Sequence, residues 1–218
     1  MCSDYACPVS EASGSRAERK ERTRRAILDA TLELCEDAPL AALSLRQVAK
    51  QVGIVPTAFY RHFESIEQLG LALVEESFVS LRSMMRALRA NATADFANLI
   101  DVSIATMVEH VREQEMHYAF IARERFAGPT AVRGAIDTNL VRFVDELATD
   151  LARIPVLTPW STDDLRTLSD LIVTAFVALA ERLLATSPGS SAERILTDAA
   201  RTQVRMLIIG ARQWNSSR

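Results

Sequence analysis

Thr57, Tyr60 and Arg61 bring three hydrogen-bonding side chains to one face of a short predicted helix. Residues three and four apart in an α-helix lie on the same side of it, and Ala58 adjoins them with a small side chain. A hydroxyl, a phenol and a guanidinium that point outward from a short helix suit a surface that enters the major groove and reads base edges. The alternative is a surface helix of an ordinary bundle, with Tyr60 half-packed and Arg61 solvated.

The residues before this face contain the signals that would position it. Ser44 and Gln47 have the spacing of a capping box, which predicts a helix over about 44–51. Gly53 follows where the chain must leave that helix with positive φ, a conformation that costs glycine nothing. A tight turn is therefore expected at this point.

A second short helix is expected over about 56–62. Pro56 suits its first position, because the missing N–H would be unpaired there in any residue. Phe59 and Phe63 are four residues apart and are expected to face the core. The two helices and the turn predict a helix-turn-helix over 44–63.

Charge is spread unevenly along the 218 residues. The chain has a net charge of −3, but residues 16–63 hold nine Lys or Arg against six Asp or Glu, whereas residues 64–218 are acidic overall. A basic head on an acidic body is expected when one end of a protein meets phosphate.

The remaining pattern predicts an all-α protein of about nine helices. Apolar residues recur at helical spacing, Gly and Pro are sparse at seven each, and no segment alternates with period two for long enough to form a strand. Besides the two short helices, we expect helices at about 16–37, 65–90, 95–113, 115–126, 130–154, 161–185 and 191–213.

The last two expected helices, 161–185 and 191–213, are apolar on more than one side. A helix that is apolar on two sides must be buried on two sides. Two interpretations are open: these are inner helices of a monomeric bundle, or they form the seam of a homodimer.

The helix-turn-helix ends in Tyr60-Arg61-His62-Phe63. The other distinctive fragments are Glu21-Arg-Thr-Arg-Arg25, Ser44-Leu-Arg-Gln-Val-Ala49, Pro56-Thr-Ala-Phe-Tyr-Arg-His-Phe63, Leu69-Gly-Leu-Ala-Leu-Val-Glu-Glu-Ser77 and Ala122-Arg-Glu-Arg125. These fragments resemble the TetR family of bacterial repressors, whose signature ends in the same way. Within that family they resemble the FabR/DesT branch, which controls unsaturated fatty-acid synthesis and senses acyl thioesters. The family resemblance covers about 16–80 and the branch resemblance extends through Arg125.

The resemblance implies a DNA-binding set and a palindromic double-stranded operator. By it, Ser44 and Arg46 contact phosphate at the first helix, the second helix meets the groove, His62 meets phosphate, and the segment from Arg16 to Thr23 reaches flanking phosphates or the minor groove. The expected set is Ser44, Arg46, Gln47, Pro56, Thr57, Ala58, Tyr60, Arg61, His62, Arg16, Lys20 and Thr23.

The chain departs from the family pattern at three positions. It has Val55 where most members have a capping Ser or Thr, Thr57 where they have Gly, and Glu64 where many have Lys. The missing Lys weakens one expected phosphate contact.

Apolar stripes in the body are either core or the lining of a ligand pocket, and core is the commoner case. The branch resemblance implies that part of them lines a tunnel for a fatty-acyl chain. The ligand-binding residues expected on this basis are Phe96, Ile100, Ile104, Met107, Phe120, Arg123, Arg125, Phe126, Leu140, Phe143, Val144, Leu147 and Phe176. Arg123 and Arg125 flank Glu124, which predicts either a surface ion pair or a guanidinium that binds a coenzyme A phosphate at the tunnel mouth.

Other kinds of site are not indicated. The three cysteines Cys2, Cys7 and Cys35 lack the spacing of a zinc site and are interpreted as free thiols in a reducing compartment. His110 and His117 lie among acidic residues, but no further metal ligand is placed, so no metal is predicted. No nucleophilic triad, P-loop or dinucleotide fingerprint is present in its proper context, so no enzyme is predicted and no cofactor is expected.

The first fifteen residues lack the features of a secretory signal, and the most apolar stretch, 171–180, is far shorter than the ~20 residues that span a bilayer. We therefore expect a cytoplasmic protein without membrane insertion. Its expected parts are a disordered leader at 1–15, a DNA-binding domain at 16–63, and an effector-binding and dimerisation domain at 64–218.

The resulting expectation is a repressor of TetR type that controls fatty-acid genes, in particular unsaturated fatty-acid or desaturase genes, in response to long-chain acyl-CoA. Two alternatives stay open: a TetR-type regulator of another apolar ligand, and a lipid-binding protein whose head is only structural. A helical enzyme is a weaker third. The operator, the acyl chain and the direction of the ligand's effect on DNA binding are not fixed by the sequence.

Overall fold

The computed structural model describes residues 15–90, 96–154 and 157–216, and it is all-α as expected. Within these residues there are nine α-helices, one short 3-10 helix and no strand. The helices are α1 (Arg16–Asp37), η1 (Leu40–Ala42), α2 (Leu45–Val52), α3 (Pro56–Phe59), α4 (Ile66–Ala90), α5 (Phe96–Glu113), α6 (Glu115–Ala127), α7 (Thr130–Leu151), α8 (Thr162–Leu184) and α9 (Ser191–Gln213). The predicted leader at 1–15 lies almost wholly outside the described residues.

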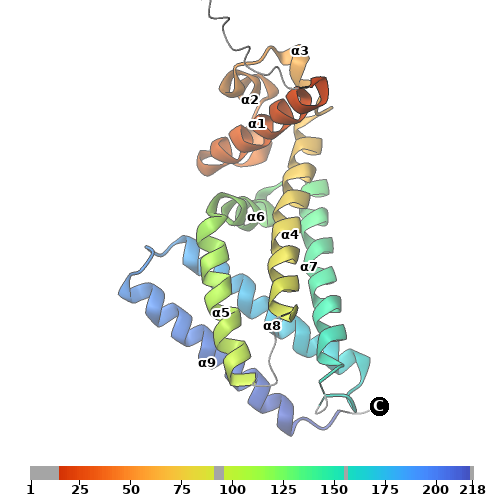
Figure 1. The fold of residues 1–218 in the computed structure, drawn as a ribbon, viewed down its shortest axis with the longest axis vertical. Helices are drawn as coiled ribbons and strands as arrows, with labels where there is room; N and C mark the ends of the chain where they lie inside the picture. Colours follow the sequence, from red (N-terminus) through yellow and green to blue (C-terminus); the bar gives the residue numbers. More distant parts are fainter. Residues whose placement is uncertain (1–14, 91–95, 155–156, 217–218) are drawn as a thin grey trace, which may run out of the picture.

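Helices α1, α2 and α3 gather at one end of the molecule, and the long helix α4 runs from this head into the body (Figure 1). Below the head, α4 and α7 lie side by side, and α6 lies beside α4, below α1 (Figure 1). The α6 helix packs against α1, α4, α7 and α8, so it contacts both the head and the body.

One hydrophobic cluster continues from the head into the body. It contains Ile27 of α1, Phe59 of α3, Leu73 of α4 and Phe143 of α7. Gly70 of α4 permits this close packing, because a Cβ there would lie 2.3 Å from a side-chain carbon of Leu40 and 3.0 Å from one of Val132. The expected division at residues 63 and 64 stays a prediction, since apolar packing spans it.

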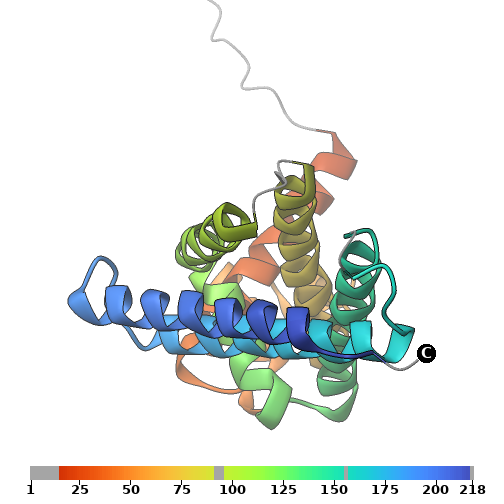
Figure 2. The same cartoon turned by 90° about the horizontal axis from the view of Figure 1, so that it is seen from below.

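The lower part of the body is formed by α5, α8 and α9 together with the end of α7. Helices α8 and α9 run side by side in opposite directions and form an outer layer on one face (Figures 1 and 2). Two smaller clusters hold this part together, one around Ile104 and Leu183 and the other around Leu151 and Leu168.

The helix boundaries differ from the sequence expectation in two places. The helix expected over 56–62 ends at Phe59, and the chain then continues through tighter turns, in which the amides of Arg61 and His62 donate to carbonyls three residues back. The helix expected to reach 154 ends at Leu151. Residue 155 is proline, which disfavours helical backbone in the residue before it.

The described helices include none that combines the length and the apolar character needed to cross a membrane.

Candidate DNA interface and apolar cavity

The α2 helix is fixed at both ends by the contacts expected from its sequence. The Ser44 hydroxyl oxygen accepts a hydrogen bond from the Gln47 amide at 3.3 Å, and the Gln47 side-chain oxygen accepts one from the Ser44 amide at 2.8 Å. At the other end Gly53 has φ 74° and ψ 29°, the left-handed conformation that the turn requires. Its amide donates to the Lys50 carbonyl at 3.1 Å, which closes the turn.

The second helix separates a buried face from an exposed one. Phe59 and Phe63 are fully buried with ring centroids 5.9 Å apart, so they attach α3 and the turn after it to the core. Thr57 and Arg61 are exposed, and Tyr60 keeps 59% of its surface exposed. These three polar side chains are therefore free to meet another molecule.

Four basic or titratable side chains gather where α1 passes the end of this turn. The charges of Lys20, Arg24 and Arg61 all act on His62, and they add to burial in lowering the pKa of that histidine, which Glu21 opposes. Arg24 also lies over the Phe63 ring, 4.4 Å from its centroid, and its guanidinium donates to the His62 carbonyl at 3.5 Å. We call Lys20, Arg24, Arg61 and His62 the basic cluster.

The remaining members of the predicted DNA-binding set also lie at the surface of the head. Ser44, Arg46, Gln47 and Pro56 are exposed, as are Arg16 and Lys20 on α1; Ala58, His62 and Thr23 are half-buried. The Thr23 hydroxyl donates to the Arg19 carbonyl of its own helix at 3.0 Å, so part of its capacity is already used. Arg24 was not predicted, because only the fold brings it beside His62.

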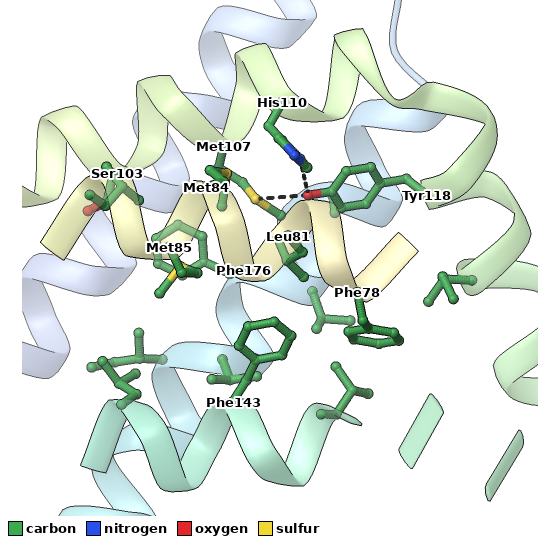
Figure 3. Close-up of a pocket in the computed structure, with 18 of the residues that line it drawn as sticks. Phe78, Leu81, Met84, Met85, Ser103, Met107, His110, Tyr118, Phe143 and Phe176 are labelled. Carbon is green, nitrogen blue, oxygen red and sulfur yellow. Dashed lines mark hydrogen bonds between the residues drawn. The ribbon is translucent and has the colours of Figure 1, made fainter. Parts of the chain in front are cut away.

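Helices α4 to α9 enclose a cavity of about 250 Å³, and side chains from all six contribute to its wall. Most of the wall is apolar, with Phe78, Leu81, Met84 and Met85 of α4 facing Phe176 of α8 (Figure 3). Its polar side chains are Ser77, Ser80, Ser103, His110, Gln114, His117, Tyr118, Arg125 and Glu181. The α4 residues were not predicted, because the sequence identifies α4 only as a connecting helix.

The structure brings seven of the thirteen predicted ligand-binding residues to this wall. They are Ile100, Met107, Arg125, Leu140, Phe143, Leu147 and Phe176. Ile104, Phe120 and Val144 are buried in the core instead, and Phe126 is 72% exposed at the surface. The side chain of Phe96 lies outside the described residues.

Arg123 and Glu124 do not form the predicted surface pair. Arg123 turns away from the cavity and donates to the carbonyls of Cys35 and, at 2.8 Å, Glu36, at the end of α1. Glu124 is fully buried, and its carboxylate accepts a hydrogen bond from the Leu40 amide at 2.9 Å. Both side chains therefore tie α6 to the end of α1 and to η1, and neither meets a coenzyme A phosphate in this arrangement.

Arg125 reaches the cavity wall but already has a partner. It pairs with Glu181 at 3.1 Å, and the two side chains are 25% and 38% exposed, so the pair marks a partly open edge of the cavity.

Other reactive groups are bound up in packing. Burial, together with the charge of Glu124, raises the pKa of the Cys35 thiol to about 12, so this cysteine stays a thiol. Over the described ranges, no three His, Cys, Asp or Glu side chains are arranged to hold a metal ion.

An exposed polar face, a basic cluster beside it and a helical body form the arrangement expected of a helix-turn-helix DNA-binding regulator. Residues 27–73 match the family model described as "Bacterial regulatory proteins, tetR family". This part of the chain is therefore similar to the tetR family of bacterial regulatory proteins.

Solved structures share this fold over both parts of the chain. A regulator from Pseudomonas aeruginosa PAO1 superposes with a TM-score of 0.71 at 14% identity, over 94% of this chain and 97% of its own. The fatty acid degradation regulator FadR from Bacillus halodurans gives 0.68 at 14% identity, over 92% and 98%. E. coli NemR in its reduced form gives 0.64 at 14% identity, over 85% and 97%.

Proposed function

We propose that the chain is a homodimeric repressor that binds a palindromic operator through the Thr57–Arg61 face and releases or tightens it when a long-chain acyl-CoA occupies the cavity. Its targets are fatty-acid genes, in particular those for unsaturated fatty acids. One structure with the same fold is that of a regulator of fatty acid degradation, which makes a fatty-acyl effector a natural candidate.

The DNA-binding part of the proposal rests on the division of the second helix into two faces. Phe59 and Phe63 are packed in the core, whereas Thr57, Tyr60 and Arg61 are exposed. The basic cluster beside them supplies positive charge for phosphate, which positions a protein on DNA without reading sequence.

The ligand part of the proposal rests on the apolar wall of the cavity. An acyl chain would be buried among Phe78, Leu81, Met84 and Phe176, and burial of its methylenes supplies the affinity. For Arg125 to contact a coenzyme A phosphate, it would have to leave Glu181. The acyl chain of the ligand, rather than its phosphates, is therefore expected to provide most of the binding free energy.

One observation carries the proposed link between ligand and DNA: α6 has its two functions on opposite faces. Tyr118, Ile121 and Arg125 line the cavity. On the other side, Arg123 holds the end of α1 and Glu124 holds η1, which follows it. A ligand that moves α6 therefore moves α1, which carries Lys20 and Arg24 of the basic cluster. Two ligands that bias one structural element are coupled in their affinities.

The dimer part of the proposal rests on apolar side chains that α8 and α9 leave uncovered. Leu171, Ile195, Met206 and Ile209 are exposed on α8 and α9, the two helices of the outer layer (Figure 2). Exposed apolar side chains, where they gather, mark an association surface. A second copy of the chain would bury it and place two recognition faces on one duplex.

The DNA-binding proposal is tested with Tyr60→Phe and Arg61→Ala, using the DNA upstream of the chain's own gene and of neighbouring lipid genes. Each variant is expected to weaken binding by ~1–3 kcal/mol in a fluorescence anisotropy titration, because each removes a base contact. Arg142→Ala, which removes an exposed guanidinium from α7, is the matched control and should bind as the wild type does. If neither head variant changes DNA binding while lipid binding persists, the chain is a lipid-binding protein with a structural head.

A further inference from the structure

A chain of hydrogen-bonded side chains lies at one place on the otherwise apolar cavity wall. His110 of α5 lies between Ser80 of α4 and Tyr118 of α6: its Nε2 is 3.1 Å from the Ser80 hydroxyl, and its Nδ1 is 2.9 Å from the Tyr118 hydroxyl. The Tyr118 hydroxyl in turn lies 3.6 Å from the sulfur of Met107 (Figure 3). All four side chains line the cavity.

The direction of these hydrogen bonds follows from the last one. The Met107 sulfur can only accept, so the Tyr118 hydroxyl donates to it. The Tyr118 oxygen then accepts from the Nδ1–H of His110, and the bare Nε2 accepts from the Ser80 hydroxyl. Burial raises the pKa of Tyr118 and lowers that of His110, so both groups are neutral and this pattern holds at neutral pH.

The chain of donors ends on a poor acceptor. A thioether sulfur accepts a hydrogen bond only weakly, whereas donors linked in series strengthen one another. The Tyr118 hydroxyl is thus a polarised donor inside an apolar cavity, without a good partner of its own there. An oxygen atom of a ligand would replace the sulfur and form a stronger bond.

The charged side chains of the wall determine which kind of ligand oxygen is favoured there. Among the Lys and Arg side chains that the structure describes, only Arg125 reaches the wall, and it is paired with Glu181. Burial lowers the pKa of the second histidine of the wall, His117, whose Nδ1 lies 2.9 Å from the Ser77 hydroxyl. Its Nε2 lies 4.0 Å from Glu76, so a proton gained by this ring would already be matched by that carboxylate. A carboxylate buried here would lack a counter-charge, which is costly.

We infer that the cavity selects a neutral carbonyl compound with an apolar chain, an ester or thioester, whose carbonyl oxygen accepts a hydrogen bond from Tyr118, and that it discriminates against the free carboxylate of the same chain. Ser80 and His110 act as positioning residues for that donor. The inference rests on the proposed function in taking this cavity as the effector site.

The test is isothermal titration calorimetry of the full chain with methyl octanoate, octanoate, octanoyl-CoA and nonane, which differ mainly in the head group. Methyl octanoate is expected to bind more tightly than octanoate. Tyr118→Phe removes a single oxygen and should weaken the binding of methyl octanoate about three- to tenfold, which is the range for one hydrogen bond. The affinity for nonane should not change. Thr138→Val, which removes a hydroxyl from the exposed face of α7, should leave every affinity unchanged.

The four ligands separate the possible outcomes. Octanoate that binds as tightly as the ester, or an ester affinity that Tyr118→Phe does not change, overturns the inference and leaves the effector cavity intact. If Tyr118→Phe weakens the binding of octanoyl-CoA by the same factor, the inference is supported with a thioester as the ligand. If only the methyl ester binds, the inference is supported and octanoyl-CoA is not an effector. If no ligand binds the wild type, the inference fails, and the oleoyl-CoA titration described below then decides the proposed function.

Discussion

The carboxylate of Glu124 accepts a hydrogen bond from the backbone amide of Leu40 across 2.9 Å, although 84 positions separate the two residues. Both groups are buried, so this bond fastens α6 to the 3-10 turn that follows α1. The neighbouring Arg123 holds the last carbonyls of α1. The α6 helix, which lines the cavity, is therefore hydrogen-bonded to the head.

Replacing Glu124 with alanine is expected to destabilise the fold by about 1–3 kcal/mol, because the Leu40 amide would lose its acceptor in a buried place. Glu124→Gln keeps an oxygen acceptor and should cost less. Urea unfolding followed by circular dichroism measures both variants. Equal stability of the alanine variant and the wild type would mean that this bond does not hold α6 to the head.

Gly53 is expected to resist substitution for a purely conformational reason. Its φ is 74°, and a Cβ at this position would meet no atom within 4 Å. Gly53→Ala should therefore lower the free energy of unfolding by about 1–2 kcal/mol through backbone strain, and Gly53→Asn by less, since asparagine tolerates the left-handed region better. Urea unfolding curves test this. An alanine variant as stable as the wild type would show that the turn does not need positive φ.

Stability is expected to fall as the pH drops below the ordinary histidine pKa of about 6.5. Burial lowers the pKa of both His110 and His117 in the folded chain; Glu113 opposes this at His110, and at His117 Glu76 and Asp29 oppose it while Arg25 adds to it. The unfolded chain then binds protons more readily than the folded one. The contribution of the two neutral histidines to stability is therefore full above pH ~6.5, and it is lost as the pH falls to their lower pKa values in the folded chain.

Urea unfolding at several pH values between about 7.5 and 5.5 measures this slope. Replacing both histidines with glutamine should reduce it and leave the contribution of His62, whose pKa is also lowered. The lowered pKa values of Asp164 and Glu193 act in a separate, more acidic window, because carboxyl groups take up protons there. An undiminished slope in the double variant would assign the pH dependence to groups other than His110 and His117.

The sequence was sufficient for the parts of the fold that depend on local signals. The Ser44 cap, the Gly53 turn and the buried Phe59 and Phe63 lie as their spacing indicates. The second helix begins at Pro56 as expected but ends early, because after Phe59 the amides of Arg61 and His62 bond to carbonyls three residues back.

The cavity depends on gaps between helices, which no single stripe reveals. Ile104 and Met107 are both buried on α5, yet only Met107 lines the wall. His110 and Tyr118 lie on two helices separated by a break at Gln114, so their contact arises only from the packing. Glu124 looked like a surface residue because an unpaired carboxylate is seldom buried, and its partner is a backbone amide that sequence patterns do not show.

Occupation of the cavity is proposed to change the affinity of the head for DNA. The direct measurement uses a labelled duplex that the protein has selected from a random pool. The duplex is titrated with the protein at fixed salt, with and without saturating oleoyl-CoA, and its fluorescence anisotropy gives the dissociation constant. This constant is expected to change by about fivefold or more, in the range usual for coupled sites. An unchanged dissociation constant, with oleoyl-CoA shown by calorimetry to be bound, would contradict it.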